Sequence, residues 1–271
     1  MQKETAWCNL KASELRQLAT ENAIVIVPIG SIEQHGPHLP VQVDALLAGE
    51  VCRRAAVYMA NSVAVTVTPT IWSGLAEHHM SFGGTLTLDF DTFRSVIRCI
   101  CRSIQQHGFV RIALINGHGG NIAALTVISA ELTLELNATV ACATYWHVAE
   151  KEFNNILEAQ QTIRHAGEAE TSMLLALRPD LVDQQIIATF EPPTDGLGAE
   201  NGIYRWRPIK DWSDSGVIGV PAAATAEKGV QLLEAAGKAL ATQLATPPSG
   251  KTEKIKPSFI SHRSPRAVNS R

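Results

Sequence analysis

The sequence predicts an α/β fold of three layers, in which a central, mostly parallel sheet lies between two layers of helices. Short apolar runs of strand length alternate along the chain with amphipathic segments of helix length, and this alternation is typical of parallel sheets. The first run, Ala23–Ile29, is apolar throughout, as in strands that are buried on both faces. The 271 residues, 45% of them hydrophobic and 18% charged, are enough for one large core.

The individual elements follow from the same periodicity. The predicted strands are short runs rich in apolar residues: Ala23–Ile29, Ala64–Thr68, Arg111–Ile115 and Thr139–Thr144. The predicted helices repeat their apolar residues at the helical period: Ala12–Glu21, Ala45–Met59, Asp91–His107, Ile122–Leu136, His165–Leu177 and Ala224–Leu244. Ligands of such sheets bind beyond the carboxyl ends of the strands, so the residues that follow each strand are the first candidates for a functional site.

The chain reads as one domain, residues 1–246, followed by a basic tail, residues 247–271. The tail has six lysines and arginines against one acid, Glu253, and few apolar residues. This composition predicts a disordered or extended arm. A solvated end is the favoured interpretation, and an arm that clasps a neighbouring subunit is the alternative.

Composition also excludes several classes of function. A formal net charge of −3 gives no electrostatic reason to expect nucleic acid as a partner. We expect no membrane contact, because no apolar signal core follows Met1 and no run approaches the roughly 18 apolar residues of a membrane span. Five scattered cysteines, an odd number, suit a reducing interior, which predicts a cytoplasmic protein.

The first candidate site follows the first strand. Glu33 and His35 stand at alternate positions, so their side chains project to one side if the chain stays extended. Asp44 comes nine residues after His35, beyond two prolines that stiffen the loop. Carboxylate and imidazole together are a ligand set for zinc, manganese or iron(II). This loop therefore predicts most of a metal site.

The second candidate is His118, which lies between glycines where the strand Arg111–Ile115 turns into the helix Ile122–Leu136. Glycine permits unusual backbone angles and leaves the imidazole accessible. The helix that follows adds free N–H groups and the positive end of its dipole. We expect His118 to be a further metal ligand.

The third candidate lies at the start of the helix predicted for His165–Leu177. His165 and Glu168 are about one helical turn apart, so they share a face if that turn is formed. Glu170 is more simply explained as an acidic residue near the positive end of the helix. We expect His165 and Glu168 to be functional and Glu170 to be structural.

These motifs together resemble the creatininase (creatinine amidohydrolase) family. The resemblance extends from about residue 12 to residue 240. It rests on the following segments: Gly30–Pro40 with Asp44, Glu77–His79 with Gly84 and Thr85, Asn116–Asn121, His165–Glu168, Gly216–Pro221 and Thr225–Gly229.

The resemblance implies an α/β/α fold, a metal centre at the carboxyl ends of the strands and a ring-like homohexamer. Four residues match metal positions of the family: Glu33, His35, Asp44 and His118. Asp44 is expected to bridge two ions when both sites are filled. His165 matches the general base or proton shuttle, and Glu168 belongs to a motif whose acid completes the second coordination sphere or the second metal site.

One departure from the family pattern concerns the substrate. Creatininases proper have a glutamate two residues after the histidine of the strand-to-helix turn, where this chain has Gly120. This difference favours the broader branch of the family, which includes formamide deformylases, over creatinine hydrolysis. Glu168 is the candidate to replace the missing carboxylate. A second, smaller departure is Gly83, which stands where proline is usual.

The resulting prediction is a metal-dependent amidohydrolase that cleaves a C–N amide bond in a small cyclic amide, lactam or formamide through a metal-activated water. The cofactor is one or two divalent ions, zinc first, with manganese or iron as alternatives. No cysteine lies in a motif that suggests a nucleophile. A peptidase acting on a short modified peptide and a non-catalytic metal-binding assembly protein remain alternatives.

Three further features are predicted around the site. The segment Glu191–Asp214, rich in proline, glycine and aromatic residues, either covers the site or fills a subunit interface, unless it is a plain surface excursion. His38 and His79 are candidates to orient metal ligands or substrate. His147 follows a strand end, and we expect it to be a packing or hydrogen-bonding residue.

Overall fold

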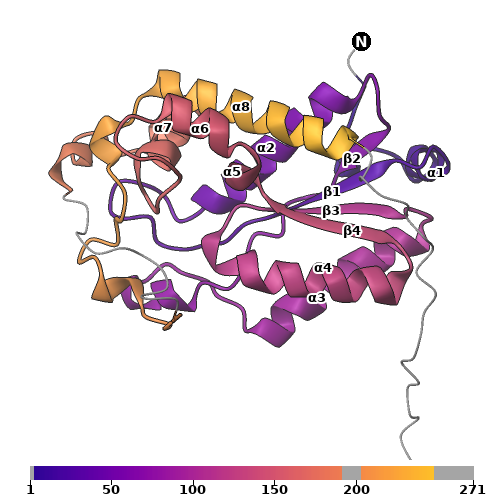
Figure 1. Cartoon of the computed structure of the whole chain (residues 1–271), viewed down its shortest axis with the longest axis horizontal. Coiled ribbons are helices and arrows are strands. Elements are labelled where there is room, and N and C mark those ends of the chain that lie inside the picture. Colours follow the sequence, from indigo (N-terminus) through magenta and orange to yellow (C-terminus); the bar gives the residue numbers. More distant parts are fainter. Residues whose placement is uncertain (1–2, 191–202, 247–271) are drawn as a thin grey trace, which may run out of the picture.

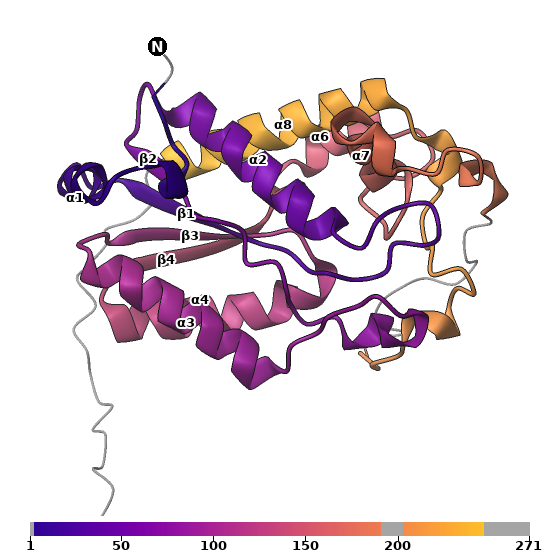
Figure 2. The same ribbon diagram turned by 180° about the vertical axis from the view of Figure 1, so that it is seen from behind.

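The computed structural model describes residues 3–190 and 203–246, and in this part of the chain a parallel sheet lies between two helical layers. Helices α2 and α8 cover one face of the sheet, and α3 and α4 cover the other, as Figure 1 shows. Viewed from behind in Figure 2, α2 crosses directly over the strands. The predicted α/β/α fold class is therefore confirmed. The predicted basic tail, residues 247–271, lies outside the described residues.

The sheet has the order β2-β1-β3-β4, with all neighbouring strands parallel. Its strands are β1 Ile24–Ile29, β2 Val65–Val67, β3 Arg111–Asn116 and β4 Thr139–Thr144. Each matches a predicted strand to within one residue at either end. Because β1 and β3 are adjacent and parallel, the loops that follow them leave the same edge of the sheet side by side.

The six predicted helices are all present, at α1 Ala12–Thr20, α2 Val43–Met59, α3 Phe90–Gln106, α4 Ile122–Leu136, α7 Glu168–Leu177 and α8 Ala226–Ala245. Two shorter helices were not predicted, α5 Tyr145–Val148 and α6 Glu150–Ile156. Two helical boundaries matter for the site. Helix α2 begins early enough to include Asp44 in its first turn, and α7 begins three residues after His165.

Two apolar cores form, one on each side of the sheet. Alternate residues of β1 supply them: Ile24 and Ile26 face the core under α2, α7 and α8, whereas Val25 and Val27 face the core under α3 and α4. All residues of β1 are buried, as the continuous apolar run predicts. In the described part of the chain, no helix is long and apolar enough to cross a membrane.

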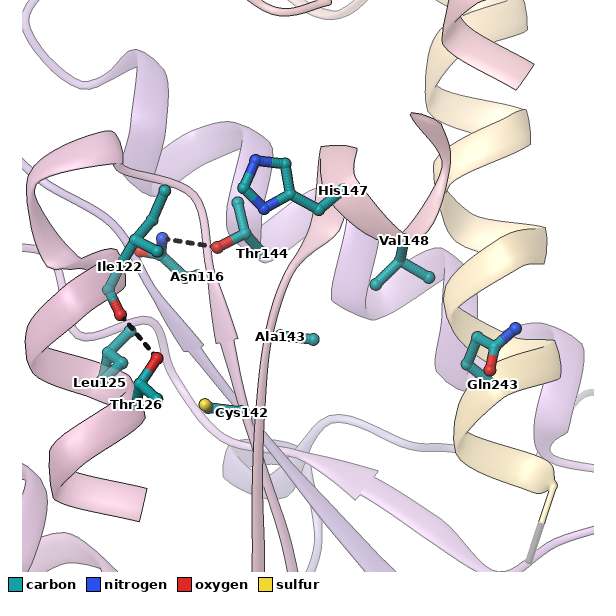
Figure 3. A pocket seen from close by; sticks show the side chains of 10 residues that line it. All are labelled: Asn116, Ile122, Leu125, Thr126, Cys142, Ala143, Thr144, His147, Val148 and Gln243. Carbon is teal, nitrogen blue, oxygen red and sulfur yellow. Dashed lines mark hydrogen bonds between the residues drawn. The ribbon is translucent and has the colours of Figure 1, made fainter. Parts of the chain in front are cut away.

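The edge of β4 borders a pocket of about 580 Å³ between the two helical layers, shown in Figure 3. Asn116 and Thr144, at the ends of β3 and β4, are hydrogen-bonded in its wall, with 3.1 Å between Asn116 Nδ2 and Thr144 Oγ1. His147 of α5 also lines this pocket, and its side chain is exposed. The same Asn116 amide also donates to the His118 carbonyl, so this pocket adjoins the loop that carries His118.

Candidate metal centre

The loop after β1 brings three of the predicted ligands together. His35 Nε2 lies 3.1 Å from Asp44 Oδ1, and ligand atoms of Glu33, His35 and Asp44 all lie within 4.8 Å of one another. Close contact between the loop and α2 makes this possible, because a Cβ atom at Gly30 would lie only 2.4 Å from the Cα atom of Ala45. Glycine therefore allows the first turn of α2 to place Asp44 beside the strand end.

The loop after β3 adds His118 to the same cluster. Its Nδ1 atom lies 2.9 Å from Glu33 Oε2 and 3.0 Å from Asp44 Oδ2. Asn116 holds the loop in place: its side-chain oxygen accepts from the His118 N–H at 3.0 Å, and its amide donates to the His118 carbonyl at 2.7 Å. The structure thus brings together the four predicted ligands Glu33, His35, Asp44 and His118.

Hydrogen bonds to carbonyl groups determine which nitrogen of each ligand histidine carries the proton. His118 Nε2 lies 3.1 Å from the Leu75 carbonyl, and His35 Nδ1 lies 3.0 Å from the Glu33 carbonyl. A carbonyl oxygen only accepts, so each of these nitrogens is an N–H. When the ring is neutral, its other nitrogen is then a lone pair directed at the carboxylates, which is the usual arrangement of metal-binding histidines.

Two carboxylate oxygens show that this donor set fits a cation. Glu33 Oε2 and Asp44 Oδ2 are buried and have no hydrogen-bond donor among the described residues. Both face His118 Nδ1 at about hydrogen-bond distance, and this nitrogen is a lone pair whenever the ring is neutral. Buried charges of this kind are costly unless a cation neutralises them. A divalent ion held by Glu33 Oε2, Asp44 Oδ2 and His118 Nδ1 would neutralise the two carboxylates and accept the lone pair of the neutral ring.

The pKa directions reflect the same concentration of charge. Burial alone would lower the pKa of His118, but Glu33 and Asp44 raise it well above its ordinary value. Burial also lowers the pKa of His35, but the neighbouring carboxylates, Asp44 above all, outweigh it and raise that pKa to about 9. Without an ion, the two histidines therefore hold protons that neutralise the carboxylates, and a metal would replace those protons.

Glu168 is not among the side chains that the structure brings together in this cluster. Helix α7 begins at Glu168, so His165 precedes the helix and the two side chains do not share a face. The reason is the backbone at Ala166, whose φ of 54° is left-handed and turns the chain before the helix starts. The Glu168 carboxylate instead accepts hydrogen bonds from the backbone N–H of Ala159 at 2.9 Å and from Lys228 Nζ at 2.7 Å. It is absent from the ligand clusters.

Glu170 occupies the place expected of Glu168. Its Oε2 atom lies 3.8 Å from His35 Nε2 and accepts a hydrogen bond of 2.6 Å from the Ala166 N–H. Ligand atoms of His35, His165 and Glu170 lie within 4.8 Å of one another. Burial raises the pKa of Glu170 to about 7, although His35 opposes this shift. The third carboxylate of the site is therefore Glu170.

His79 and His165 complete the cluster around the second oxygen of Glu33. His79 Nε2 lies 3.1 Å and His165 Nδ1 lies 3.6 Å from Glu33 Oε1. Burial lowers the pKa of both histidines, so both rings are neutral. His79 comes from the 3-10 helix η2, Glu77–Phe82, and its predicted orienting role stays a prediction. His38 bonds to Thr171 Oγ1 at 3.0 Å, away from the carboxylates.

The structure has no room for a side chain at position 120. A Cβ atom at Gly120 would lie 2.3 Å from the Leu75 carbonyl oxygen and 2.5 Å from His118 Nε2. The ring of His78 also approaches this point and stacks on His118 with 5.5 Å between the ring centroids. A glutamate cannot replace Gly120 unless His118 or its support moves.

A cavity of about 990 Å³ opens onto the cluster. One wall comes from the predicted covering segment Glu191–Asp214, of which residues 191–202 lie outside the described residues. In the described part, Tyr204, Trp206 and Trp212 line the cavity together with two arginines. Trp212 packs under Arg207, whose Cζ atom lies 5.1 Å from the ring centroid. The covering role predicted for this segment is supported by its position.

The fold and the site together define an α/β protein with a candidate metal centre at the carboxyl edge of its parallel sheet, beside an open cavity. A sequence model of the creatininase family, described as creatinine amidohydrolase, matches residues 8–244. The chain belongs to the creatininase family of hydrolases.

Known relatives differ in what they act on. The creatinine amidohydrolase of Pseudomonas putida is 31% identical over 209 residues, 70% of this chain and 76% of that protein. The mycofactocin precursor peptide peptidase of Mycolicibacterium smegmatis is 30% identical over 230 residues, 82% of this chain and 85% of that protein. A solved structure described as "Creatininase Mn" superposes with a TM-score of 0.75 at 26% identity, covering 89% of this chain and 98% of that one.

Proposed function

We propose that this protein is a metal-dependent amidohydrolase that cleaves a C–N amide bond in a small cyclic amide, lactam or formamide. The observation that carries the proposal is the pair of buried oxygens Glu33 Oε2 and Asp44 Oδ2, which both face His118 Nδ1 and have no other donor among the described residues. Such an arrangement suits a divalent ion, and the cavity beside it gives a substrate access.

The residues that would hold the ion are Glu33, Asp44 and His118, and a second ion would be held by His35, Glu170 and the shared Asp44. Zinc and manganese both suit carboxylate and imidazole ligands, with iron as a further choice. When bound, a divalent ion supplies a Lewis acid and lowers the pKa of water towards about 7.

The chain itself supplies orientation and proton control. His165 Nδ1 is the ring atom that faces the cluster, 3.6 Å from Glu33 Oε1, so proton exchange with the substrate takes place at Nδ1. The ring is neutral because burial lowers its pKa, and a neutral imidazole has one N–H that donates a hydrogen bond and one lone pair that can accept a proton. Gly119, directly after His118, lines the cavity, and a Cβ atom there would have no neighbour within 4 Å.

Creatinine itself is not the favoured substrate. The glutamate that creatininases proper have two residues after the ligand histidine is absent, and the backbone at Gly120 leaves no space for it. Glu170 supplies a carboxylate from the other side of the cluster. The substrate is therefore placed differently against the ligands, which favours another small amide.

A second candidate function is a peptidase that acts on a short modified peptide. Two observations favour it: the similarity to the mycobacterial peptidase covers more of the chain than that to creatinine amidohydrolase, and the cavity lies at the upper end of the range for small-molecule sites, about 300–1,000 Å³. The exposed rings of Tyr204 and Trp206 would give an extended peptide apolar contacts.

The test is a substrate panel with protein reconstituted separately with zinc, manganese and iron(II). Creatinine, hydantoins, lactams, formamides and short peptides are supplied, with the His165→Ala variant as the control. Turnover of one small-amide class that is lost in the variant supports the amidohydrolase. Turnover of peptides alone supports the second candidate, and tight metal binding without any turnover supports a non-catalytic assembly protein.

We further propose that the protein is a cytoplasmic homohexamer with a small-molecule substrate and no nucleic-acid partner. The hexamer rests on the family resemblance, and the compartment rests on five cysteines that are all free in the structure. Light scattering coupled to size-exclusion chromatography measures the number of subunits directly.

A further inference from the structure

Gln34 lies between the metal ligands Glu33 and His35 and joins the two neutral histidines of the site. Its side chain is buried, with Nε2 at 2.8 Å from His79 Nδ1 and at 3.0 Å from His165 Nε2. The same Nε2 atom lies 3.3 Å from the Gly216 carbonyl, and Oε1 lies 2.8 Å from the Gly36 N–H. One amide therefore contacts both rings.

Backbone groups determine which way this amide points. The Gly36 N–H only donates, so it must face the side-chain oxygen, and the Gly216 carbonyl only accepts, so it must face the NH₂ group. Both contacts give the same orientation. Exchanging the oxygen and nitrogen of the amide would place two donors together at Gly36 and two acceptors together at Gly216.

Two glycines hold the amide closely. Gly36 and Gly216 have φ angles of 66° and 83°, in the left-handed region that favours glycine. A Cβ atom at Gly216 would lie 2.1 Å from Gln34 Oε1, so any other residue there would push the amide aside. The local backbone thus holds Gln34 in one position.

The NH₂ group then specifies where both rings carry their protons. The amide has two N–H hydrogens for three neighbours: they point to the two shorter contacts, His79 Nδ1 and His165 Nε2, and the Gly216 carbonyl shares one of them at 3.3 Å. Since an amide nitrogen only donates, both ring nitrogens are lone pairs. The protons lie on His79 Nε2 and His165 Nδ1. These are the two atoms that face Glu33 Oε1, at 3.1 Å and 3.6 Å.

We propose that Gln34 is a positioning residue that fixes the tautomers of His79 and His165, so that His79 orients the ligand carboxylate of Glu33 and His165 presents Nδ1–H to the substrate. The catalytic part of this inference rests on the proposed function. In the resting enzyme His165 is then a hydrogen-bond donor to the substrate, in the way that a neutral imidazole can polarise a carbonyl group.

The first test measures the tautomers in the zinc-loaded wild-type protein, since zinc is diamagnetic. Solid-state ¹⁵N spectra of protein labelled at histidine distinguish Nδ1–H from Nε2–H and from imidazolium. The signals are assigned by their loss in His165→Ala and His79→Ala proteins. We expect Nδ1–H for His165 and Nε2–H for His79. The opposite tautomer or an imidazolium at either ring would overturn the proposal.

The second test uses Gln34→Glu, which has nearly the same shape and still accepts from the Gly36 N–H but no longer donates to the rings. We expect the His165 signal to change to Nε2–H and kcat to fall about 100-fold, the scale of one lost hydrogen-bond donor at the reacting group. KM should stay within about threefold, because the group acts mainly in the transition state. If the tautomer of His165 changes in Gln34→Glu while kcat does not, the inference that His165 presents Nδ1–H to the substrate is contradicted.

Gln160→Glu is the matched control, since Gln160 is also a buried amide. Its oxygen accepts from the backbone N–H groups of Glu168 at 2.9 Å and Val220 at 2.8 Å, and its amide donates to the Thr162 carbonyl rather than to a histidine. We expect it to leave the histidine spectrum unchanged. If Gln34→Glu does not fold, the wild-type spectrum still decides the inference. If no substrate is turned over, the proposed function fails while the spectrum tests Gln34 independently.

Discussion

Glu168 and Glu170 are two residues apart at the start of α7, yet their surroundings are opposite. Glu168 is fully buried against backbone N–H groups and Lys228, which neutralises it and anchors the loop before α7 to α8. Glu170 faces the histidine and carboxylate cluster, where no lysine or arginine of the described chain is paired with it. Glu168 is therefore paired within the fold, whereas Glu170 faces the candidate metal centre.

We predict that Glu170→Gln and Glu168→Gln separate these roles. Glu170→Gln should weaken zinc binding at least about tenfold, because a ligand charge is lost. Glu168→Gln should leave zinc affinity within about threefold and lower the free energy of unfolding by about 1–3 kcal/mol, because Lys228 loses its buried partner. Zinc titration with a competing chelator and urea denaturation measure the two quantities. A larger loss of zinc affinity in Glu168→Gln than in Glu170→Gln would reverse the assignment.

The glycines after His118 provide a second residue-scale prediction. Gly120→Ala places a Cβ atom against His118 Nε2 and the Leu75 carbonyl, so His118 must move and zinc affinity should fall about 10- to 100-fold. Gly119→Ala is the control, because its Cβ atom would have no neighbour within 4 Å. Both affinities come from the same chelator competition. Equal affinities in the two variants would show that position 120 does not support His118.

At this scale the sequence predicts four candidate ligands, which lie after strands or at a helix start and which the structure brings together. Glu33, His35, Asp44 and His118 could be found because strand ends of a parallel sheet meet at one edge. Glu170 was missed, since the left-handed turn at Ala166 is not a feature that residue types reveal. A signal existed in its spacing, because Glu170 stands five positions after His165 with a glycine between them.

At the scale of elements, the crossing of α7 and α8 supports the His165 loop. Gly229 of α8 lies so close to α7 that a Cβ atom there would be 1.9 Å from the Ser172 carbonyl oxygen. Thr225, the N-cap of α8, donates its backbone N–H to Ser172 Oγ at 3.1 Å. The start of α8 therefore packs against the middle of α7, two residues beyond Glu170.

We predict that Gly229→Ala lowers the free energy of unfolding by about 1–3 kcal/mol, the usual cost of forcing extra atoms into a packed contact. Val230→Ala in the same helix is the control, because its side chain is exposed and should change stability by less than about 0.5 kcal/mol. Urea denaturation of metal-free protein gives both values. If Gly229→Ala were as stable as the wild type, the close approach of the helices would not be required.

The elements themselves were largely predictable, and the exceptions have physical reasons. The long helices and the strands each bury a continuous apolar face, which sets a clear period in the sequence. The short helices α5 and α6 contain too few turns to show such a period. The start of α7 was placed too early, because His165 and Ala166 are compatible with a helix until the backbone of Ala166 turns left-handed.

For the whole molecule, the site joins segments that are distant in the sequence. Its side chains come from the loop after β1, the start of α2, η2, the loop after β3 and the start of α7. An ion bound to them would connect both helical layers through the edge of the sheet. A ligand that binds only the folded state raises the free energy of unfolding by about 2.7 kcal/mol when its free concentration is 100 times its Kd. Metal removal should therefore destabilise the entire domain.

The last prediction concerns the pH dependence of the metal-free protein. Asp44 raises the pKa of His35 to about 9 against the opposing effect of burial, and the pKa of His118 is also raised. The folded state thus holds these protons more tightly than the unfolded chain, whose histidines titrate near 6.5. This stabilisation is complete below pH 6.5 and is lost as the pH rises towards 9, by up to about 3 kcal/mol for His35.

The zinc-loaded protein should behave differently, because zinc replaces the same protons and binds more tightly as they leave. Thermal unfolding at pH 7, 8 and 9 should therefore show a falling melting temperature without metal and a growing difference between the zinc-loaded and metal-free proteins. His35→Asn, which lacks the titrating ring, should show a weaker dependence on pH without metal. A metal-free protein that is more stable at pH 9 than at pH 7 would mean that these histidines do not neutralise the buried carboxylates, and the argument for a cation at Glu33 and Asp44 would lose its electrostatic basis.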